Sequence, residues 1–525
     1  MTAARARMTA VVGVIVLALG GGGWVIGKGF HVGESAASAR LFDQVLDNIA
    51  NKYVDSVDVG ALYERAAAGL VKELGDPHSV YLDSARLARV QASINGLVGN
   101  VGLEVDTRSG WVKVVAALPG TPAEQAGLRA GDRLLAIDGR STEGWTPERA
   151  IRALRGLPGS SVRIAVERLG TTKRTELMLE RDTVYVRPVQ RSMVLEDGVG
   201  YVSLRTFSDS AAIELAATID SLRRAGMRSL ILDLRDNPGG LLAQGAEVAD
   251  LFLDKGKTIV SLHSRGPDAR RDVVDQRSQR WPEVHVAVLV NRATASAAEI
   301  VAGALQDHDR ALVLGRPTYG KGSAQSVFSF HDAAGVKLTT ARWFTPAGRN
   351  IEYLPPGARD TAPGAPRDSS GRPVFKTDSG RKVFGGGGIV PDVLSGDSVS
   401  FPTAARVLFT AVGPNVRKLR AAVTVEARRL AKRGVSGPMF DVTADMRGDV
   451  YQELVRSGVT VDRPLFDNAA DWLDRALGGE TVRYAYGRQA ETRRLVLSDR
   501  VVQEAATKLK SARTTRELLG STFEP

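Results

Sequence analysis

HVAVLVNRATASAAEIVAGALQDHDRALVLG, residues 285–315, consists of an apolar run, a small-residue segment with helical character and a second apolar run. Short runs that are apolar throughout are typical of strands buried on both faces. The same order of strand and helix repeats from residue 186 to about 400, for example in SLILDLRDNPGG followed by LLAQGAEVADLFL. This alternation predicts a mainly parallel sheet covered by helices.

Ser296 lies in this stretch at the predicted passage from strand to helix, between the small residues Ala295 and Ala297. Free N–H groups at the start of a helix favour developing negative charge. A serine here is most often only a helix cap, and nucleophilic chemistry requires a positioned base. Lys321, between two glycines after the second apolar run, is the candidate base. Its amine acts as a base only when neutral, which requires burial or a positive field to lower a pKa of about 10.4.

His308 is the alternative base, in a Ser-His-Asp arrangement with Asp307 or Asp309. It follows Ser296 by about 12 helical residues, which is roughly 18 Å, so it cannot reach the serine. The six histidines are scattered without zinc-ligand spacing, and the sequence contains no cysteine. We therefore expect no metal, no thiol chemistry and no cofactor.

The length of 525 residues predicts several domains, at roughly 150 residues for each. Its net charge of +11 comes from Lys and Arg residues that are interleaved with Asp and Glu. The sequence has no dense basic run with interleaved aromatic residues, which is the pattern that a nucleic-acid surface requires. We therefore expect no nucleic-acid partner.

The N-terminus predicts export. Residues 8–27, MTAVVGVIVLALGGGGWVIG, are uncharged and long enough for a helix to cross a hydrocarbon core of ~30 Å. Arg5 and Arg7 precede this segment, which places the extreme N-terminus in the cytoplasm. A cleaved signal is the alternative, but the small-x-small site at 37–39 lies well beyond the apolar core. We favour a retained inner-membrane anchor within residues 1–30, with the rest of the chain in the periplasm of a bacterial cell envelope.

The pattern changes on both sides of the predicted sheet region. Residues 36–95 place apolar side chains at helical spacing, and residues 96–185 contain short β-like runs between Gly/Pro turns. Residues 355–382 are rich in Pro, Gly, Ser and charge, which predicts a solvated loop inserted into the sheet domain. Residues 401–525 contain amphipathic helices, which predict a small helical domain that packs within the chain or between subunits of a homo-oligomer.

Residues 96–185 resemble a PDZ domain through VGNVGLEV at 98–105 and ALPGTPAEQAGLRAGDRLLAIDG at 117–139. In such a domain the main-chain N–H groups of a loop bind the terminal carboxylate of a peptide, which adds as a strand to the sheet edge. Asn100 stands where the family commonly has glycine. The resemblance implies a substrate-binding loop that contains Val101, Gly102 and Leu103.

ATASAAEIVAGALQDHDRALVLGRPTYGKGSAQ, residues 293–325, resembles the catalytic segment of the carboxyl-terminal processing proteases, also called tail-specific proteases, of serine peptidase family S41. LDLRDNPGGLL, residues 232–242, matches the oxyanion segment of that family. Further similar segments bring the match to most of residues 40–395. The resemblance implies Ser296 as nucleophile and Lys321 as general base. It also implies that Gln325 orients the lysine amine, and that the oxyanion is held by N–H groups of Gly240, or its neighbour Gly239, and of Ala297.

The resemblance implies an α/β multidomain fold. Its expected parts are N-terminal helices, an inserted β-rich PDZ domain, a ClpP/crotonase-like peptidase core over 186–400 and a C-terminal helical extension. The implied function is a serine endopeptidase that cleaves in or near protein C-terminal tails, with the PDZ domain in substrate recognition or gating. Two alternatives remain. One is a non-catalytic PDZ scaffold or hydrophobic-ligand carrier, and the other is hydrolysis of a small amide or ester by the same two residues.

Overall fold

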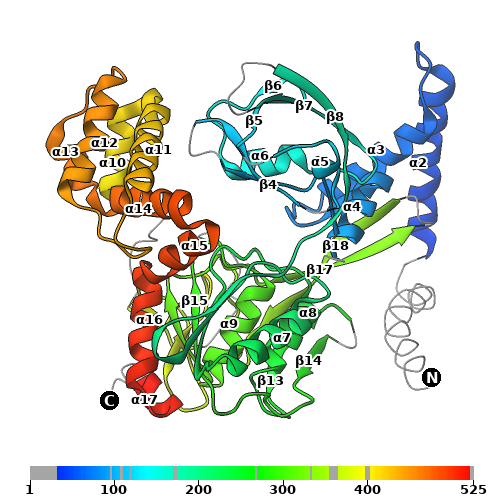
Figure 1. Ribbon diagram of the computed structural model, residues 1–525. Coiled ribbons are helices and arrows are strands. Elements are labelled where there is room, and N and C mark those ends of the chain that lie inside the picture. The colour runs from blue at the N-terminus through cyan, green and yellow to red at the C-terminus, as the bar shows by residue number, and fades with distance from the viewer. Residues whose placement is uncertain are drawn as a thin grey trace, which may run out of the picture. The chain divides into compact units, whose positions relative to one another are not determined.

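Figure 1 shows the computed structural model of the chain. Its described residues divide into two compact units. Those up to residue 88 and those between 324 and 340 belong to the smaller unit, and the others belong to the larger. No helix among the described residues is long and apolar enough to cross a membrane, and the predicted anchor at 8–27 lies outside them. The structure describes residues 32–94, 97–106, 110–118, 120–129, 131–168, 174–266, 269–330, 334–353, 365–369, 371–395 and 403–520.

The smaller unit combines helices with a short antiparallel sheet. Helix α3 (Val59–Lys72) follows α2 (Val32–Lys52), and its first turn is capped by Asp58, whose carboxylate accepts from the Ala61 N–H at 3.1 Å. Strand β1 (Val80–Asp83) pairs antiparallel with the first residues of β18, which also pairs with β17. The bounds of the remaining elements here are β17 (Ser323–Phe330), β18 (Ala334–Phe344) and α4 (Ser84–Ile94), and the last residues of α4 and β18 belong to the larger unit.

The segment 96–185 forms a β-rich domain with a sheet in the order β3-β4-β5-β7-β8 and β6 beside β5. Four fully buried aliphatic residues of this sheet pack with Leu154 of its longer helix: Val112, Leu134, Val162 and Ile164. At its two ends β2 (Leu97–Asn100) pairs with β9 (Asp182–Tyr185). The other elements are β3 (Leu103–Asp106), β4 (Val112–Ala117), α5 (Pro122–Gln125), β5 (Arg133–Ile137), β6 (Arg140–Ser141), α6 (Pro147–Leu154), β7 (Ser161–Glu167) and β8 (Arg174–Glu180).

The core of the larger unit is a six-stranded sheet in the order β10-β11-β12-β15-β16-β21. Strands β11, β12, β15, β16 and β21 are parallel, and only the edge strand β10 is antiparallel to its neighbour. This agrees with the parallel sheet that the alternating pattern predicts. The strands are β10 (Val189–Val194), β11 (Val199–Leu204), β12 (Ser229–Asp233), β15 (His285–Val290), β16 (Ala311–Gly315) and β21 (Val393–Leu394), with η3 (Glu196–Gly198) between the first two.

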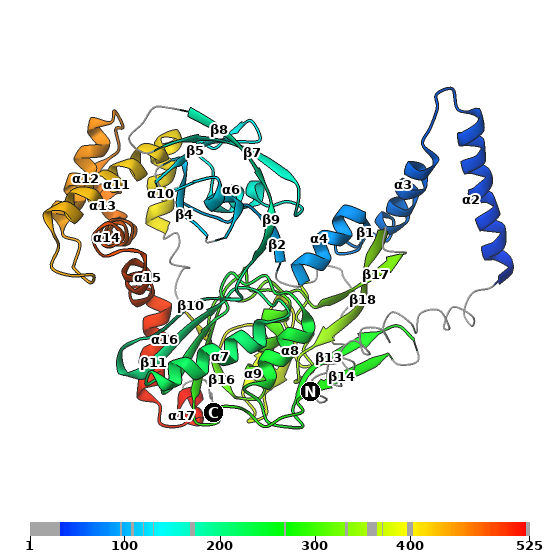
Figure 2. The ribbon, with the colours of Figure 1, turned by 45° about the vertical axis from the view of Figure 1, so that its right-hand side comes forward.

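Helices cover both faces of this sheet (Figure 2). Val286 and Val288 of β15 pack with α7 (Ala211–Arg224), α8 (Leu242–Asp250) and α9 (Ala297–Asp307). Ala287 and Leu289 face the other way, toward α16 (Arg500–Ser511) and α17 (Thr515–Leu519). Burial of a large aliphatic side chain contributes about 1.5–3 kcal/mol, so a strand buried on both faces is continuously apolar.

A second, antiparallel sheet contains β13 (Thr258–Ser264) and β14 (Arg270–Val274), and β13 pairs with the last residues of β18. The predicted solvated loop at 355–382 is partly wrong. The second half of this segment forms most of a hairpin of two antiparallel strands, β19 (Val374–Lys376) and β20 (Lys382–Phe384). Arg381 in the hairpin turn is buried and bonded to Asp309 at 2.6 Å and Asp392 at 2.5 Å. Ion pairs replace apolar packing here, so composition alone indicated a loop.

The C-terminal segment is helical, as predicted, but it does not form a single separate domain. Its first helices share an apolar cluster that includes Leu419, Leu454, Phe466 and Leu473, whereas the last two pack on the core sheet. The helices are α10 (Thr403–Val412), η4 (Gly413–Asn415), α11 (Val416–Arg433), α12 (Ala444–Arg456), α13 (Arg463–Asn468), α14 (Ala470–Tyr486), α15 (Arg488–Leu497), α16 (Arg500–Ser511) and α17 (Thr515–Leu519).

Candidate active site

Ser296 lies at the turn between β15 and the start of α9. Its backbone angles are φ 57° and ψ −118°, a conformation that costs about 1–3 kcal/mol for a residue with a Cβ atom. Ser296 is partly exposed, while Ala295 and Ala297 are buried. The strained turn therefore presents the serine at the end of a buried strand, where a hydroxyl can meet a substrate.

A glycine turn after β12 packs directly against this serine. Gly239 has φ 92°, and a Cβ atom on it would lie 2.7 Å from the Ala295 carbonyl oxygen and 2.8 Å from Ser296 Cβ. Gly240 instead packs against Phe207, since a Cβ there would lie 2.3 Å from the Phe207 carbonyl oxygen. Only glycine fits both positions. The peptide group between Gly239 and Gly240 is thus beside the serine turn, and the oxyanion role of Gly240 and Ala297 stays a prediction.

Asn237 holds the glycine turn and the serine turn together, and the sequence analysis missed it. Its Nδ2 donates to the Leu204 carbonyl at 2.8 Å, and its Oδ1 accepts from the Gly239 N–H at 2.8 Å. Its own carbonyl accepts from the Ala295 N–H at 2.9 Å. The only sequence signal was an asparagine before Pro-Gly-Gly, which indicates a turn rather than a site.

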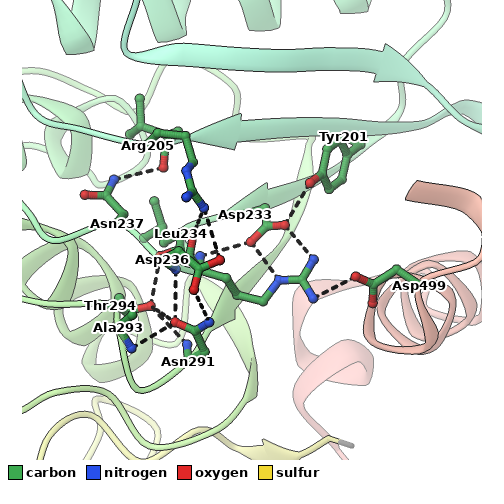
Figure 3. A network of polar contacts seen from close by, with 12 residues as sticks. Tyr201, Arg205, Asp233, Leu234, Asp236, Asn237, Asn291, Ala293, Thr294 and Asp499 are labelled. Atoms are coloured by element: carbon green, nitrogen blue, oxygen red, sulfur yellow. Dashed lines mark hydrogen bonds and ion pairs between the residues drawn. The ribbon is translucent and has the colours of Figure 1, made fainter. Parts of the chain in front are cut away.

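A further set of contacts joins the same two turns from the side of β12 (Figure 3). Asn291 Nδ2 donates to Asp236 Oδ1 at 2.9 Å, and Asn291 Oδ1 accepts from the Asp236 N–H at 3.0 Å. Thr294 Oγ1 donates to the Leu234 carbonyl at 2.8 Å. The segment after β12 and the segment after β15 are therefore fixed to each other by side-chain hydrogen bonds.

Glu299, in the first turn of α9, is a completely buried carboxylate that accepts four hydrogen bonds. Its Oε2 accepts the N–H groups of Ser296 at 2.7 Å and Lys321 at 3.0 Å. Its Oε1 accepts the Gly320 N–H at 2.7 Å and the Thr318 hydroxyl. Burial raises the pKa of the Glu299 carboxyl, and these hydrogen bonds oppose that rise.

Glu299 therefore brings the main chains of Ser296 and Lys321 together. Both nitrogens lie within 3.0 Å of one oxygen, so they are separated by about 6 Å or less. Trp343 holds the other side of the lysine, since its indole N–H donates to the Lys321 carbonyl at 2.9 Å. Lys321 is itself partly buried. Sequence analysis did not identify Glu299, because an acidic residue three positions into a helix is usually only an N-terminal cap partner.

The remaining candidate side chains are Gln325 and His308. Gln325 belongs to the smaller unit, where its Nε2 donates to Thr339 Oγ1 at 3.2 Å, and its orienting role stays a prediction. His308 lies at the opposite end of α9 from Ser296, as predicted. Its ring nitrogens contact Asp378 Oδ2 at 2.9 Å and the Thr258 carbonyl at 2.7 Å.

The predicted carboxylate-binding loop lies at the start of β3. Gly102 has φ 77°, and a Cβ on it would lie 2.2 Å from Thr121 Cβ, so the loop requires glycine. Val101 and Leu103 are buried. The Val101 N–H donates to Asn100 Oδ1 at 2.7 Å. Asn100 therefore occupies one N–H group of this loop, and carboxylate binding there stays a prediction.

A strained serine at the end of a parallel strand, backed by a glycine turn and tied to a lysine segment, defines a candidate serine hydrolase site on an α/β fold. Family models agree with this class. Residues 198–357 match peptidase family S41, residues 113–168 match the PDZ domain, and residues 30–85 match the activating protease CtpB N-terminal domain.

Two related proteins give the same result. The carboxy-terminal processing protease CtpA of Bacillus subtilis (strain 168) is 32% identical over 62% of this chain and 71% of its own length. The carboxyl-terminal-processing protease of Picosynechococcus sp. is 37% identical over 55% of this chain and 70% of its own. A solved photosystem II D1 C-terminal processing protease is 29% identical over 63% of this chain and 95% of its own, with a TM-score of 0.36.

The chain belongs to peptidase family S41, with relatives named carboxyl-terminal processing proteases. The family resemblance and the predicted fold class are both confirmed: an S41 peptidase fold with a PDZ domain and a C-terminal helical region.

Proposed function

We propose that the chain is a serine endopeptidase in which Ser296 is the nucleophile and Lys321 the general base. The observation that carries this proposal is the pair of hydrogen bonds from their backbone N–H groups to one oxygen of Glu299. In the first step the neutral lysine amine accepts the serine proton while the serine oxygen attacks the scissile carbonyl. The proton then passes to the leaving amine, and water hydrolyses the acyl-enzyme in a second round.

The oxyanion of each tetrahedral intermediate needs donors beside the serine. We assign them to the N–H groups of Ala297 and Gly240, because the neighbouring Gly239 N–H already donates to Asn237 Oδ1, and one such donor contributes roughly 3–4 kcal/mol. Gln325 is proposed to orient the lysine amine. The support for the glycine assignment is the close packing of Gly239 on Ser296.

The proposed substrates are unstructured C-terminal tails of proteins. The PDZ domain would bind the terminal carboxylate at Val101, Gly102 and Leu103 and add the tail as a strand, in recognition or in gating. A matched pair of peptides, with a free carboxylate or a C-terminal amide, tests this step. The carboxylate form should be cleaved at least tenfold more efficiently, and equal rates would remove the loop from substrate recognition.

The dyad is tested on the protein without residues 1–30, using casein and a tail peptide as substrates. Ser296→Ala and Lys321→Ala should each lower cleavage by more than about 1,000-fold, because nucleophile and base act as a unit. Ser278→Ala and Lys376→Ala, both at exposed positions, are the matched controls and should cleave at the wild-type rate. Cleavage retained by either dyad variant would refute the assignment. A wild-type protein that binds tails and never cleaves them would favour the scaffold or carrier.

We also propose that residues 8–27 anchor the chain in the inner membrane and leave the peptidase in the periplasm. Support comes from the uncharged length of this segment and the preceding Arg5 and Arg7. Reporter enzymes fused after residue 35 and at the C-terminus should both be active only on the periplasmic side. Release of the full chain into the soluble periplasm would indicate a cleaved signal instead.

A further inference from the structure

A cavity of about 340 Å³ lies at the carboxyl ends of the core strands, under the C-terminal helices. Asn291 and Gly315 line it from the strand ends and Tyr201 from within β11, and Trp472 and Ala476 of α14 line it from the helices. The carboxyl ends of parallel strands are the usual ligand-binding edge of an open α/β sheet. None of the residues that we propose for catalysis is among the lining residues that the structure describes.

The charged lining of this cavity is unbalanced. It contains five arginines but only three carboxylates, with no lysine or glutamate among the described lining residues. The excess of two positive charges favours an anion, and guanidinium groups suit the planar fork of a carboxylate. The arginines are Arg191, Arg205, Arg235, Arg316 and Arg475, and the carboxylates are Asp233, Asp236 and Asp499.

The three carboxylates already have partners within the protein. Asp233 accepts from Arg235 at 2.7 Å and from the Tyr201 hydroxyl at 2.8 Å. Asp499 accepts from Arg235 Nη1 at 2.9 Å (Figure 3), while its other oxygen caps the start of α16. Asp236 pairs with Arg205 at 3.2 Å. These contacts use the carboxylates and leave the positive excess of the cavity in place.

Helix α16 also begins beside the cavity. The Asp499 carboxylate already accepts from the N–H groups of Val501 and Val502 in its first turn, so the partial positive charge of this helix end is balanced within the protein. Burial lowers the pKa of the Arg475 guanidinium; Asp499 and Asp471 oppose this change, and Arg500 and Arg235 add to it. A bound anion would offset the desolvation of Arg475.

The remaining lining includes the polar residues Ser203, Asn291 and Ser395 and a set of apolar residues. Val290 contributes from a strand end, Ala476 from α14, and Leu495, Val496, Val501 and Val502 from α15 and the start of α16. A bare inorganic anion would leave this apolar surface in contact with water. The volume falls at the lower end of the range of about 300–1,000 Å³ for small-ligand pockets, which fits a ligand of one or two residues.

We propose that this cavity binds a carboxylate carried on an apolar body of one or two residues in size. The C-terminal end of a peptide and a small free organic acid share this chemistry. The site lies beyond the proposed catalytic residues, yet Asp233 and Arg235 immediately precede the segment that packs on Ser296.

The test is calorimetric titration of the full chain carrying Ser296→Ala, which cannot turn over peptide. Acetyl-Val-Leu with a free carboxylate should bind, and its C-terminal amide should bind at least tenfold more weakly. Arg475→Gln should weaken binding at least tenfold, and Arg191→Gln, at an exposed rim position, about threefold. Arg456→Gln on the distant helix α12 is the matched control and should change nothing.

Ala476→Phe fills the apolar side without altering charge and should also abolish this binding, with circular dichroism and thermal unfolding showing that each variant folds. If isovalerate binds as tightly as the dipeptide, the natural ligand is a free organic acid. If isovalerate binds at least tenfold more weakly, the natural ligand is the C-terminal end of a peptide. Dipeptide binding that is unchanged in every cavity variant would be assigned to the PDZ loop. The proposal is overturned if all dipeptide binding is of this kind. It is also overturned if the cavity binds phosphate and Ala476→Phe leaves that binding intact. Because catalysis is disabled, this outcome is independent of the peptidase assignment.

Discussion

Two carboxylate systems lie at the same edge of the core sheet and are built in different ways. On the serine side, Glu299 accepts three backbone N–H groups and one hydroxyl. On the side of the C-terminal helices, Asp233 and Asp499 both accept from the guanidinium of Arg235. The first system fixes main-chain positions directly. The second joins side chains from segments that are distant in sequence.

The difference predicts how each system responds to mutation. Glu299 has no exposed surface. Loss of its carboxylate would leave four donors without an acceptor, two of them fully buried, and each buried donor costs about 1–3 kcal/mol. Arg235 and Asp499 keep 18% and 17% of their side-chain surface exposed, so water can replace part of a lost contact. Glu299, which accepts backbone N–H groups, therefore tolerates substitution less well than the ion pair of Arg235 and Asp499 at the cavity wall.

Glu299→Gln is the strongest way to break this comparison. The amide keeps the shape of the side chain. Its NH₂ group would, however, replace one carboxylate oxygen and face donors that this oxygen accepts from in the wild type. We expect the free energy of unfolding to fall by about 2–4 kcal/mol and cleavage of a tail peptide to fall at least 100-fold. Urea unfolding and initial rates measure both effects. Glu283→Gln, at an exposed position, is the control. A wild-type cleavage rate for Glu299→Gln would show that Glu299 has no role in catalysis.

Gly239→Ala tests the glycine turn against a closely matched glycine. Gly239 and Gly226 have nearly the same φ, 92° and 94°, but a Cβ at 226 meets nothing within 4 Å. Both substitutions carry the same backbone strain, and only the one at 239 also clashes with Ala295 and Ser296. We expect cleavage to fall about 10- to 100-fold for Gly239→Ala and to change less than twofold for Gly226→Ala. Equal losses would show that backbone strain, rather than contact with the serine turn, is responsible.

The sequence predicted the parts of the site that follow from strand and helix order. Ser296 at the strand-to-helix junction and Lys321 after the next strand were identified from their positions, with the family resemblance supporting both. The alternation also predicted the parallel sheet, because strands buried on both faces are continuously apolar.

The residues that connect the site could not be found in the same way. Asn237 and Glu299 act through hydrogen bonds to backbone groups that are close only after folding, and such bonds leave no periodic pattern. Arg381 is buried through ion pairs with Asp309, which is distant in sequence, and with Asp392, which lies in another turn of the chain. The local composition does not reveal these pairs and therefore predicts a solvated loop. Composition indicates apolar burial well and burial of paired charges poorly.

Asp499→Asn should have a smaller effect than either change at the serine side. Asparagine can still cap α16 through its oxygen, but it loses the charge that Arg235 contacts at 2.9 Å. We expect unfolding free energy to fall by about 1–2 kcal/mol and cleavage to fall less than fivefold. Asp471→Asn, whose partner Arg500 is exposed, is the control. A loss as large as that of Glu299→Gln would show that the two systems are not separable.

Asp275 provides a third arrangement, in which a carboxyl group faces another acid, and here the expected effect on cleavage is smallest. It is almost fully buried, and burial together with the neighbouring Asp250 carboxyl raises the pKa of Asp275 to about 7. The unfolded chain releases this proton near pH 3.8, so the native state binds more protons between these values. Its contribution to stability is complete below about pH 4 and is lost as the pH rises through about 7.

Asp275→Asn removes that dependence of stability on pH. Urea unfolding from pH 5 to pH 8 should therefore show a smaller decline in stability with rising pH for the variant than for the wild type, while Asp272→Asn at an exposed position should not flatten the decline. Parallel curves for Asp275→Asn and the wild type would mean that Asp275 is ionised throughout this range, with its charge balanced by the Arg277 side chain that also contacts Asp250 at 2.6 Å.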